Sequence, residues 1–531
     1  MARYLTLAAA VLAAVVLGVM TVAVGHVILP WLFAAAVALV AVGVVDLFQS
    51  RHSLLRNYPL LGHLRWVFEG IRPEIRQYLI ESDEDRVPFS REQRTIVYAR
   101  AKNELSARPF GTQLDVYEAG YAWLGHSIAA GPPPDHDFRV AIGGPGCARP
   151  YSASLYNISA MSFGALGANA IRALNKGAKL GGFAHDTGEG SISRYHRENG
   201  GDLIWEIGSG YFGCRNRDGS FDPVRFAEQA AEDQVKMVEI KLSQGAKPGH
   251  GGVLPAPKVS PEIAEARHVP MGEDCISPAR HGAFSTPVEM MRFIQLLREG
   301  AKGKPVGFKL CIGHRWEFLA LVKAMLETGI LPDFIVIDGK EGGTGAAPLE
   351  FVNHLGTPLV DGLTFARDAL IGAGLRDRIR IGASGKLVTA FDVAWAMALG
   401  ADWCNSARGF MFALGCIQAQ KCHTNRCPVG VATQDPLRQR ALVVPDKATR
   451  VANFHRATLE ALAEIVAAAG LDHPRRLSPE HIFVRGRTGL VTSAAQAYPA
   501  LSPGELLSGT ANPVFARYWQ MASADHFAPA V

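Results

Sequence analysis

The amino-acid sequence predicts an α/β protein in which a (β/α)8 TIM barrel follows an N-terminal transmembrane helical hairpin. Two long uncharged segments lie near the start of the chain, and eight short β-rich runs alternate with helical stretches after residue 150. Strands that alternate with helices pair in parallel through crossover connections. A chain of 531 residues is long enough for a large barrel with accessory segments.

The first part of the chain, residues 1–49, predicts two membrane-spanning helices. Residues 5–25 form an uncharged stretch of 21 residues, and residues 27–45 form another of 19. About 20 helical residues are needed to cross about 30 Å of hydrocarbon. A cleaved signal peptide would have an apolar core of only about 7–15 residues and no second span. A buried hairpin of a soluble protein is the other alternative.

The charges of the chain predict the orientation of the hairpin and argue against one class of partner. Arg3 precedes the hairpin, and Arg51, Arg56 and Arg65 follow it. Positive residues favour the cytoplasmic side, so we expect a protein of the cell inner membrane with its catalytic domain in the cytoplasm. A net charge of +5 without a basic stripe gives no support for nucleic-acid binding, and no such partner is expected.

Three further regions are expected after the hairpin. Residues 50–150 predict a polar, helical connecting region, because apolar and charged residues recur there at helical spacing. The Pro- and Gly-rich motif "GPPPDHD" breaks the helical pattern of that region. The barrel is then expected over residues 151–440. Residues 441–531 are expected to form a C-terminal helical extension.

Eight strands and their connections over about 260 residues match the size of a (β/α)8 barrel. Amphipathic helices between them are expected at residues 289–299, 316–327 and 391–399. The strands are expected in "SLYNISAM", "GGFAHDT", "DLIWEIG", "MVEIKLS", "PVGFKLC", "DFIVID", "RIRIGAS" and "DWCNSAR". An open doubly wound sheet is the alternative.

Glycine-rich and polar loops follow these runs, at the end of a barrel where active sites lie. They include "MSFGAL", "DTGEGS", "GSGYFG", "QGAKPGHGG", "DGKEGGTGAAP", "GASGK" and "NSARG". Repeated glycine after strands indicates that the backbone comes close to a bound group.

Three of the eight cysteines, Cys416, Cys422 and Cys427, lie within twelve positions, and Pro428 follows the last of them. Thiolates at this density, with a proline after the last ligand, are typical of iron–sulfur ligation. A 4Fe–4S cluster needs four ligands, whereas this loop offers three cysteines, so a 3Fe–4S cluster is expected. Zinc bound by these cysteines and His423 is one alternative, and three unligated core thiols are the other.

The loops after the seventh and eighth predicted strands are candidates for holding a cofactor phosphate. Barrels commonly bind phosphate there, so the backbone N–H groups of Ser384, Gly385, Arg408 and Gly409 are candidate donors. Two simple helix-start turns are the alternative.

Lys309 lies in an apolar run that predicts the fifth strand. A lysine in such a run is unusual unless it is paired. In the barrel mouth it could stabilise negative charge on a reduced flavin ring. A structural salt bridge to a neighbouring carboxylate is the alternative.

Several motifs together strongly resemble the synthase domain of glutamate synthases. They are "CIQAQKCHTNRCPVGVATQDP", "SAMSFGALG", "HDTGEG", "QGAKPGHGG" and "GGTGAAP", and the resemblance runs from about residue 151 to about residue 453. The chain is most similar to the short, membrane-anchored, FMN-binding members of that family.

The resemblance implies a barrel with FMN at its mouth and a 3Fe–4S cluster alongside. It also implies reductive amination, in which ammonia and 2-oxoglutarate form an imine that reduced FMN converts to glutamate. Cys416, Cys422 and Cys427 match the cluster ligands. Lys247 and Arg267 match positions that bind the 2-oxo acid, and His250 is a candidate substrate-binding residue beside them. Lys247 and Lys309 are the candidate catalytic residues. The implied FMN-binding residues are Ala160, Met161, Ser162, Gln244, Lys309, Gly343, Ser384, Gly385, Arg408 and Gly409.

Departures from the family pattern leave alternatives for the function. Longer members begin with an amidotransferase domain that has an N-terminal cysteine, whereas here the hairpin follows Met1 and the first cysteine is Cys147. We therefore expect a separate ammonia-supplying subunit and, since no NAD(P)H-binding domain is evident, a separate ferredoxin-like or reductase electron donor. The family usually has Glu at position 250 and Gln at position 253, where this chain has His250 and Val253. These two changes favour, as one alternative, a different amino or 2-oxo acid substrate. A membrane electron-relay or scaffold subunit without its own turnover is another.

Overall fold

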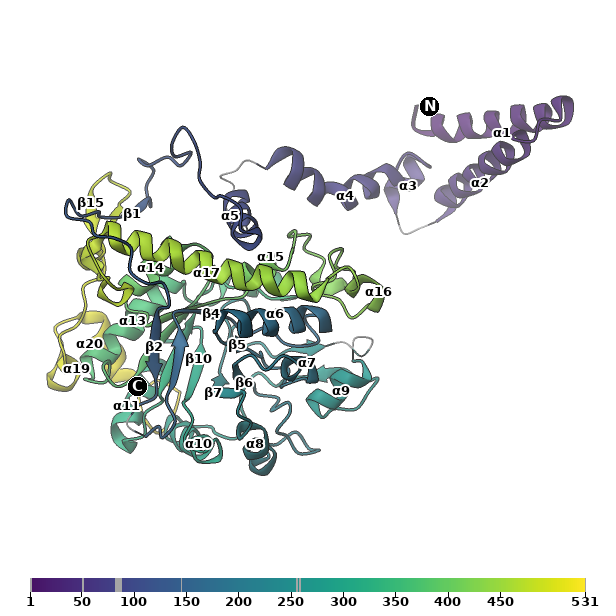
Figure 1. Ribbon diagram of the computed structural model, residues 1–531. Helices are drawn as coiled ribbons and strands as arrows, with labels where there is room; N and C mark the ends of the chain where they lie inside the picture. The colour runs from purple at the N-terminus through teal and green to yellow at the C-terminus, as the bar shows by residue number, and fades with distance from the viewer. Residues whose placement is uncertain are drawn as a thin grey trace. The chain divides into compact units, whose positions relative to one another are not determined.

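The computed structural model describes residues 2–49, 52–81, 88–144, 146–254, 256 and 259–530, so Arg51 lies outside the described residues. The chain divides into two compact units, Met1–Asp83, which we call the N-terminal unit, and Glu84–Val531, which we call the barrel unit (Figure 1).

The N-terminal unit begins with two apolar helices of 20 residues, α1 (Leu5–Val24) and α2 (Leu29–Phe48), which contact each other. Both are long and apolar enough to cross a membrane. Gly25 ends α1 in the left-handed conformation that favours glycine. Three shorter elements follow: α3 (Ser53–Asn57), α4 (His63–Ile75) and a π-helical turn, η2 (Arg76–Ile80).

Eight parallel strands close the barrel in the order in which they occur along the chain. They are β4 (Tyr156–Ile158), β5 (His185–Asp186), β6 (Leu203–Ile207), β7 (Val235–Lys241), β10 (Val306–Leu310), β11 (Phe334–Asp338), β12 (Arg380–Ser384) and β13 (Trp403–Ser406). Each overlaps one of the eight predicted runs, with β7 beginning two residues before its run, so the barrel is confirmed and the open sheet is excluded. Both faces of β10 and β11 are buried, as expected for strands between a packed interior and outer helices.

Helices connect the strands and form the outer layer (Figure 1). The helices predicted between strands are confirmed as α10 (Pro287–Gly300), α11 (Arg315–Thr328) and α14 (Ala390–Ala398). Local sequence explains their starts, since Thr286 and Glu289 form a capping box on α10. The connecting helices are α6 (Ala168–Gly181), α7 (Arg194–Arg197), α8 (Pro223–Ala230), α10 (Pro287–Gly300), α11 (Arg315–Thr328), α13 (Leu359–Gly372) and α14 (Ala390–Ala398).

Three strand–helix loops are longer and carry small elements of their own. The loop after β7 contains β8 (Val253–Leu254), α9 (Pro261–Arg267) and β9 (Cys275–Ile276). The loop after β11 contains α12 (Leu349–His354). After β13 come α15 (Arg408–Ala413), the cysteine loop with its 3₁₀ turn η4 (Cys422–Thr424), and α16 (Pro436–Gln439).

The region before the barrel differs from the helical connection that the sequence predicts. Its last helix is α5 (Arg91–Lys102), and the described chain then runs through β1 (Ala122–Leu124) and β2 (Arg139–Ile142). β2 pairs with β3 (Tyr151–Ser154) as an antiparallel hairpin. The Gly144 N–H of this hairpin donates to Asp333 Oδ1 at 2.6 Å, just before β11. The hairpin therefore lies at the amino-terminal end of the barrel.

The C-terminal region is also more than a helical extension. α17 (Val444–Ala468) lies along α6 and buries Val451, Phe454 and Leu462, so it belongs to the outer layer of the barrel (Figure 1). The barrel thus continues beyond residue 440. β14 (Ile482–Arg485) and β15 (Val491–Ser493) then form a sheet with β1. The chain ends with α18 (Ala494–Ala497), α19 (Glu505–Ser508) and α20 (Pro513–Met521).

Candidate functional site

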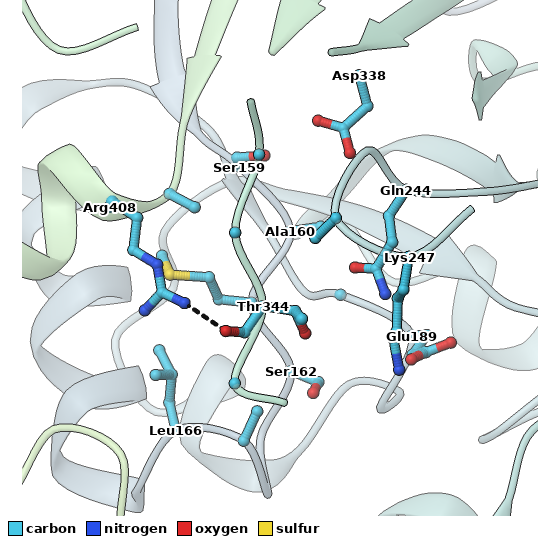
Figure 2. Close-up of a pocket in the computed structure, with 18 of the residues that line it drawn as sticks. Ser159, Ala160, Ser162, Leu166, Glu189, Gln244, Lys247, Asp338, Thr344 and Arg408 are labelled. Carbon is cyan, nitrogen blue, oxygen red and sulfur yellow. Dashed lines mark hydrogen bonds between the residues drawn. The ribbon is translucent and has the colours of Figure 1, made fainter. Parts of the chain in front are cut away.

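A cavity of about 330 Å³ opens at the carboxyl ends of the barrel strands, and residues at the ends of all eight strands line it. Figure 2 shows side chains from several of these loops around one space. The predicted residues that line this cavity are Ala160, Met161, Ser162, Gln244, Lys247, Arg267, Lys309, Gly343, Ser384, Gly385, Arg408 and Cys422. The other four, Gly409, His250, Cys416 and Cys427, do not line it.

The floor of the cavity near β4 is made by closely packed backbone. A Cβ atom on Gly188, whose φ is +64°, would lie 2.6 Å from the backbone nitrogen of Ser162. Glycine at 188 therefore lets the loops after β4 and β5 pack backbone against backbone. This explains why "DTGEG" follows its strand directly.

One end of the cavity carries two cations, Arg408 and Lys386, and Glu341 is near enough to Lys386 to oppose the lowering of its pKa by burial. Arg408 donates to the carbonyl oxygen of Thr344 at 2.8 Å (Figure 2), and Lys386 lies over the ring of Phe89. Within the described ranges, neither side chain forms an ion pair. Helix α15 begins at Arg408 without a side-chain cap, so its first N–H groups lack helical partners. This end of the cavity is suited to a phosphate group.

Gly385 lies in the same end of the cavity. Its φ is +151°, and a Cβ atom there would lie 3.3 Å from Leu359 and 3.4 Å from the Cα of Gly339. Glycine at 385 keeps the β12 loop against the end of β11. Residues of the loops after β12 and β13 both line the cavity where the sequence predicts a phosphate site.

The inner wall of the cavity contains a buried ion-pair cluster around Lys309. Its ammonium contacts Glu206, lies 2.9 Å from Glu239 Oε1 and is 3.9 Å from Asp186 Oδ2. Neither carboxylate oxygen of Glu239 makes a well-directed hydrogen bond to a described residue. Lys309 therefore has the salt bridges of the structural alternative, and it also lines the cavity, so its role beside a flavin stays a prediction.

Negative charge exceeds positive charge in this cluster. Burial raises the pKa of Glu239 to about 7, even though Lys309 acts in the opposite direction. Burial also raises the pKa of Asp186 well above its usual range. For Lys309, burial alone would lower the pKa, but Glu206, Glu239 and Asp186 outweigh it and raise the pKa. The three carboxylates are close enough together to hold a metal ion, but the Lys309 ammonium already lies against all three of them.

Glu189, in the loop after β5, stands among cations at the opposite end of the cavity from Arg408 (Figure 2). Lys241 Nζ lies 3.0 Å from Glu189 Oε2. Burial would raise the pKa of Glu189, but Lys241, Lys247 and Arg267 lower it to about 2. Glu189 is therefore a carboxylate at neutral pH.

Lys247 points toward Glu189 (Figure 2) and makes no ion pair with any residue that the structure describes. Burial lowers the pKa of Lys247, and Glu189 opposes that change. Its ammonium is thus partly desolvated and has hydrogen-bonding capacity left for a ligand.

Arg267 supplies a second cation to this end of the cavity. Its guanidinium is buried, donates to the carbonyl oxygen of Phe163 at 3.1 Å, and leaves its Nε without a partner. No described carboxylate forms an ion pair with it. Since buried guanidinium groups are normally paired, this position is suited to an incoming carboxylate.

His250 does not join this set. It is exposed, its ring meets Phe351 of α12 edge-on at 5.0 Å between centroids, and it lines a small side pocket beside the main cavity. The side pocket also contacts Glu189 and Lys247. The side chain of Val253 lies outside what the structure describes.

The three cysteines lie in one irregular loop beside the cavity, all as free thiols. Cys422 lines the cavity together with His423 and Met411, whereas Cys427 is buried. Burial, with a smaller contribution from the nearby Cys422 and Cys427, raises the pKa of Cys416 to about 11. The loop has positive φ at Gln418, Gln420 and Asn425. Three such residues in one loop indicate a conformation that its surroundings must enforce.

Several site residues were not among the sequence predictions. Lys386 follows Gly385, Glu189 lies inside "DTGEGS", and Phe89 reaches the cavity from the segment before α5. The charged side chains could have been found because they stand beside glycines in post-strand loops. Phe89 carried no such signal. Its place depends on ring packing against Phe412 of α15.

Comparison with known proteins identifies the family. A model described as a conserved region in glutamate synthase matches residues 151–472. Over 487 residues, the chain is 41% identical to the glutamate synthase large subunit-like protein YerD of Bacillus subtilis (strain 168), covering 83% of this chain and 92% of that protein. It is 34% identical over 329 residues to the archaeal-type glutamate synthase (NADPH) of Thermotoga neapolitana, covering 62% of each chain. It is 35% identical over 330 residues to the archaeal glutamate synthase (NADPH) of Methanocaldococcus jannaschii, covering 62% of this chain and 61% of that protein. The chain therefore belongs to the glutamate synthase family, a family of oxidoreductases that act on CH–NH2 donors.

Proposed function

We propose that this protein is a membrane-anchored FMN and iron–sulfur oxidoreductase that forms glutamate from 2-oxoglutarate and ammonia. The observation that carries the proposal is the pair of cations without carboxylate partners, Lys247 and Arg267, beside the carboxylate of Glu189. Two separated cations match the two carboxylates of a 2-oxo diacid.

The residues around the cavity fit FMN. Arg408, Lys386 and the uncapped start of α15 offer charge and N–H groups to its phosphate. Gln244 and the loop from Ala160 to Ser162 lie between that end and the substrate end, where a flat ring would fit. When bound, FMN supplies hydride chemistry, and the protein supplies orientation and electrostatics.

The chain's own residues would then act on the substrate. Arg267 and Lys247 hold carboxylates and so orient the oxo carbon. Glu189 remains ionised at neutral pH, so its carboxylate can bind and position an ammonium ion. The Lys309 cluster keeps a positive charge at the inner wall of the cavity, with carboxyl groups that retain protons near neutral pH.

Cys416, Cys422 and Cys427 are proposed to hold a 3Fe–4S cluster, which would supply one-electron transfer. The support is chemical, since three thiols share one irregular loop and Cys422 reaches the cavity. Burial raises the pKa of Cys416, and the neighbouring Arg408 offsets part of that rise. A fourth ligand from His423 would instead indicate zinc, and metal content of the purified protein separates the two.

The surroundings of the enzyme are also proposals. Electrons would come from a separate ferredoxin-like or reductase protein, and a separate subunit could supply ammonia. The two apolar helices support anchoring in the cell inner membrane, and the arginines around them support a cytoplasmic barrel.

The test is anaerobic reduction of the purified flavoprotein, followed by addition of 2-oxoglutarate and ammonium. Flavin reoxidation with formation of glutamate is the expected result. Reoxidation only by another 2-oxo acid would support the second candidate, a related oxidoreductase with a different substrate, which the exposed position of His250 beside the site favours. Electron exchange with a carrier protein, without any small-molecule turnover, would instead indicate the relay function.

A further inference from the structure

The N-terminal unit has a helix that the anchor does not use. α4 carries the apolar residues Leu64, Val67, Phe68, Ile71 and Ile75 at helical spacing, whereas Arg65, Glu69, Arg72 and Arg76 follow another side. Of these apolar side chains, Leu64, Val67, Phe68 and Ile71 are exposed, Phe68 to 59%.

The start of α4 is tied to one end of the two long helices. His63 Nε2 lies 2.9 Å from Oδ2 of Asp46, near the end of α2, and the Leu60 N–H donates to the same oxygen at 3.0 Å. Near the start of α1, the Thr6 hydroxyl donates to the carbonyl oxygen of Pro59 at 2.7 Å. Residues 59–63 are therefore held at the end of the hairpin where α1 begins and α2 finishes.

That end would lie at a membrane surface. Each long helix has 20 residues and so spans about 30 Å, the thickness of the hydrocarbon layer. If the hairpin spans the bilayer, its tied end lies at the boundary between acyl chains and headgroups. α4 starts at this level.

The composition of α4 suits a position at the boundary between acyl chains and headgroups. Its 13 residues cover about 20 Å, too short to cross the bilayer, and Arg65, Glu69 and Arg72 oppose insertion across it. Apolar side chains beside arginines are typical of helices that lie in the interfacial plane, where arginine reaches phosphate groups. Tyr78, Leu79 and Ile80 of η2 continue the exposed apolar surface.

We infer that α4 and η2 form an interfacial helix that lies on the lipid surface, with Leu64, Phe68 and Ile71 inserted among the acyl chains. This inference rests on the membrane anchoring proposed above and adds a second attachment to it. The helix ends shortly before the barrel unit begins, so it would shorten the free tether and keep the barrel near the membrane.

The test uses the full chain in nanodiscs of phosphatidylcholine and phosphatidylglycerol. The photoactivatable residue p-benzoylphenylalanine replaces Phe68 in one variant and Glu69 in the matched control, since both positions are exposed but lie on different sides of α4. We expect at least about fivefold more lipid adducts from position 68 than from position 69, because only the former faces acyl chains. Ile71 and Arg72 form a second matched pair, and equal incorporation into nanodiscs with unchanged helix content by circular dichroism confirms folding of each variant.

Two results would overturn the inference. Adducts from position 68 on the barrel unit or on a second copy would show that protein covers this face, and equal lipid labelling at 68 and 69 would show no preferred side. In both cases the anchor would stand, because the wild-type protein would still enter nanodiscs and resist alkaline carbonate extraction. If the wild-type protein does neither, the proposed anchoring fails, and the inference fails with it.

Discussion

Arg267 illustrates how one buried side chain can define a ligand. Its guanidinium has a carbonyl partner and a thiol partner but no ion pair with a described carboxylate. A buried cation without a counterion is unfavourable, and a substrate carboxylate would remove that cost. The same reasoning applies less strongly to Lys247, which is more accessible to water.

Arg267→Gln should weaken binding of the 2-oxo acid. A hydrogen bond to a charged group contributes about 1.5–3 kcal/mol, so KM for the oxo acid should rise by roughly 10- to 150-fold, with kcat changing much less. Steady-state kinetics with an artificial reductant measure both values. Lys447→Ala, at an ion pair that does not line the cavity, is the control. An unchanged KM in the Arg267 variant would contradict this role.

Glu239 should make stability depend on pH. Its pKa rises from 4.5 to about 7 in the folded protein, so the folded state holds a proton that the unfolded chain releases. The stabilisation from that proton is complete below about pH 4.5 and is lost as the pH rises through about 7. Glu239→Gln should flatten this fall in the free energy of unfolding, by at most roughly 3 kcal/mol.

Urea titrations of the detergent-solubilised protein at several pH values measure this effect. Glu228→Gln, at an exposed surface position, is the matched control and should keep the wild-type pH profile. If the Glu239 variant also kept that profile, Glu239 would not be the group that holds an extra proton in the folded protein.

At the scale of elements, the site depends on loops rather than on the strands that carry them. The cysteine loop lies between α15 and α16. Its residues with positive φ have a conformation that is not helical, so neither helix continues into the loop. Tyr98 of α5 donates to the carbonyl oxygen of Cys416 at 2.6 Å. A helix from before the barrel thereby holds one end of the loop.

Cys422→Ser should remove or destabilise the cluster, because a hydroxyl is a poor replacement for a thiolate ligand of iron. We expect a large loss of bound iron and of visible absorption, measured on protein purified without oxygen. Cys147→Ser should retain its iron, since Cys147 lies in the hairpin at the opposite end of the barrel. Equal iron content in both variants would rule out Cys422 as a ligand.

Lys386→Ala should lower flavin affinity by about tenfold or more, since a desolvated cation beside a phosphate contributes more than about 1.4 kcal/mol. Lys386 is half-buried and forms no ion pair among the described residues. Fluorescence of flavin released on dilution measures the affinity. A variant with wild-type affinity would leave Arg408 and the start of α15 as the phosphate site.

At the scale of the whole molecule, the anchor and the barrel form separate compact units. The barrel unit has its own continuous apolar core, from strands to outer helices. Folding of the barrel should therefore not require the apolar helices.

Deletion of residues 2–83 should yield a barrel that stays in the soluble fraction and retains flavin and iron. The full chain should resist alkaline carbonate extraction, because two apolar helices hold it in the bilayer. Membrane fractionation and cofactor content of both proteins measure this. Sedimentation of the shortened protein with membranes would place an attachment site in the barrel unit.

The sequence by itself determined the features that arise from local patterns. Strand positions follow from short apolar runs, so all eight were found. The apolar helices follow from their length and composition. The cysteines are close in sequence and so must be close in space. The family motifs also located most of the cavity residues, because each lies directly after its own strand.

Only the tertiary structure decided which charges meet. The partners of Lys309 come from three other strands, and Arg267 lowers the pKa of Glu189 from a helix about 80 positions away without forming an ion pair with it. Closure of the barrel sets these distances, and no local pattern encodes them. The same holds for His250, which faces α12 from a loop that the motif places at the substrate site. Arg267 indicates a carboxylate ligand because its guanidinium is buried without an ion-pair partner among the described residues. That burial depends on the whole fold.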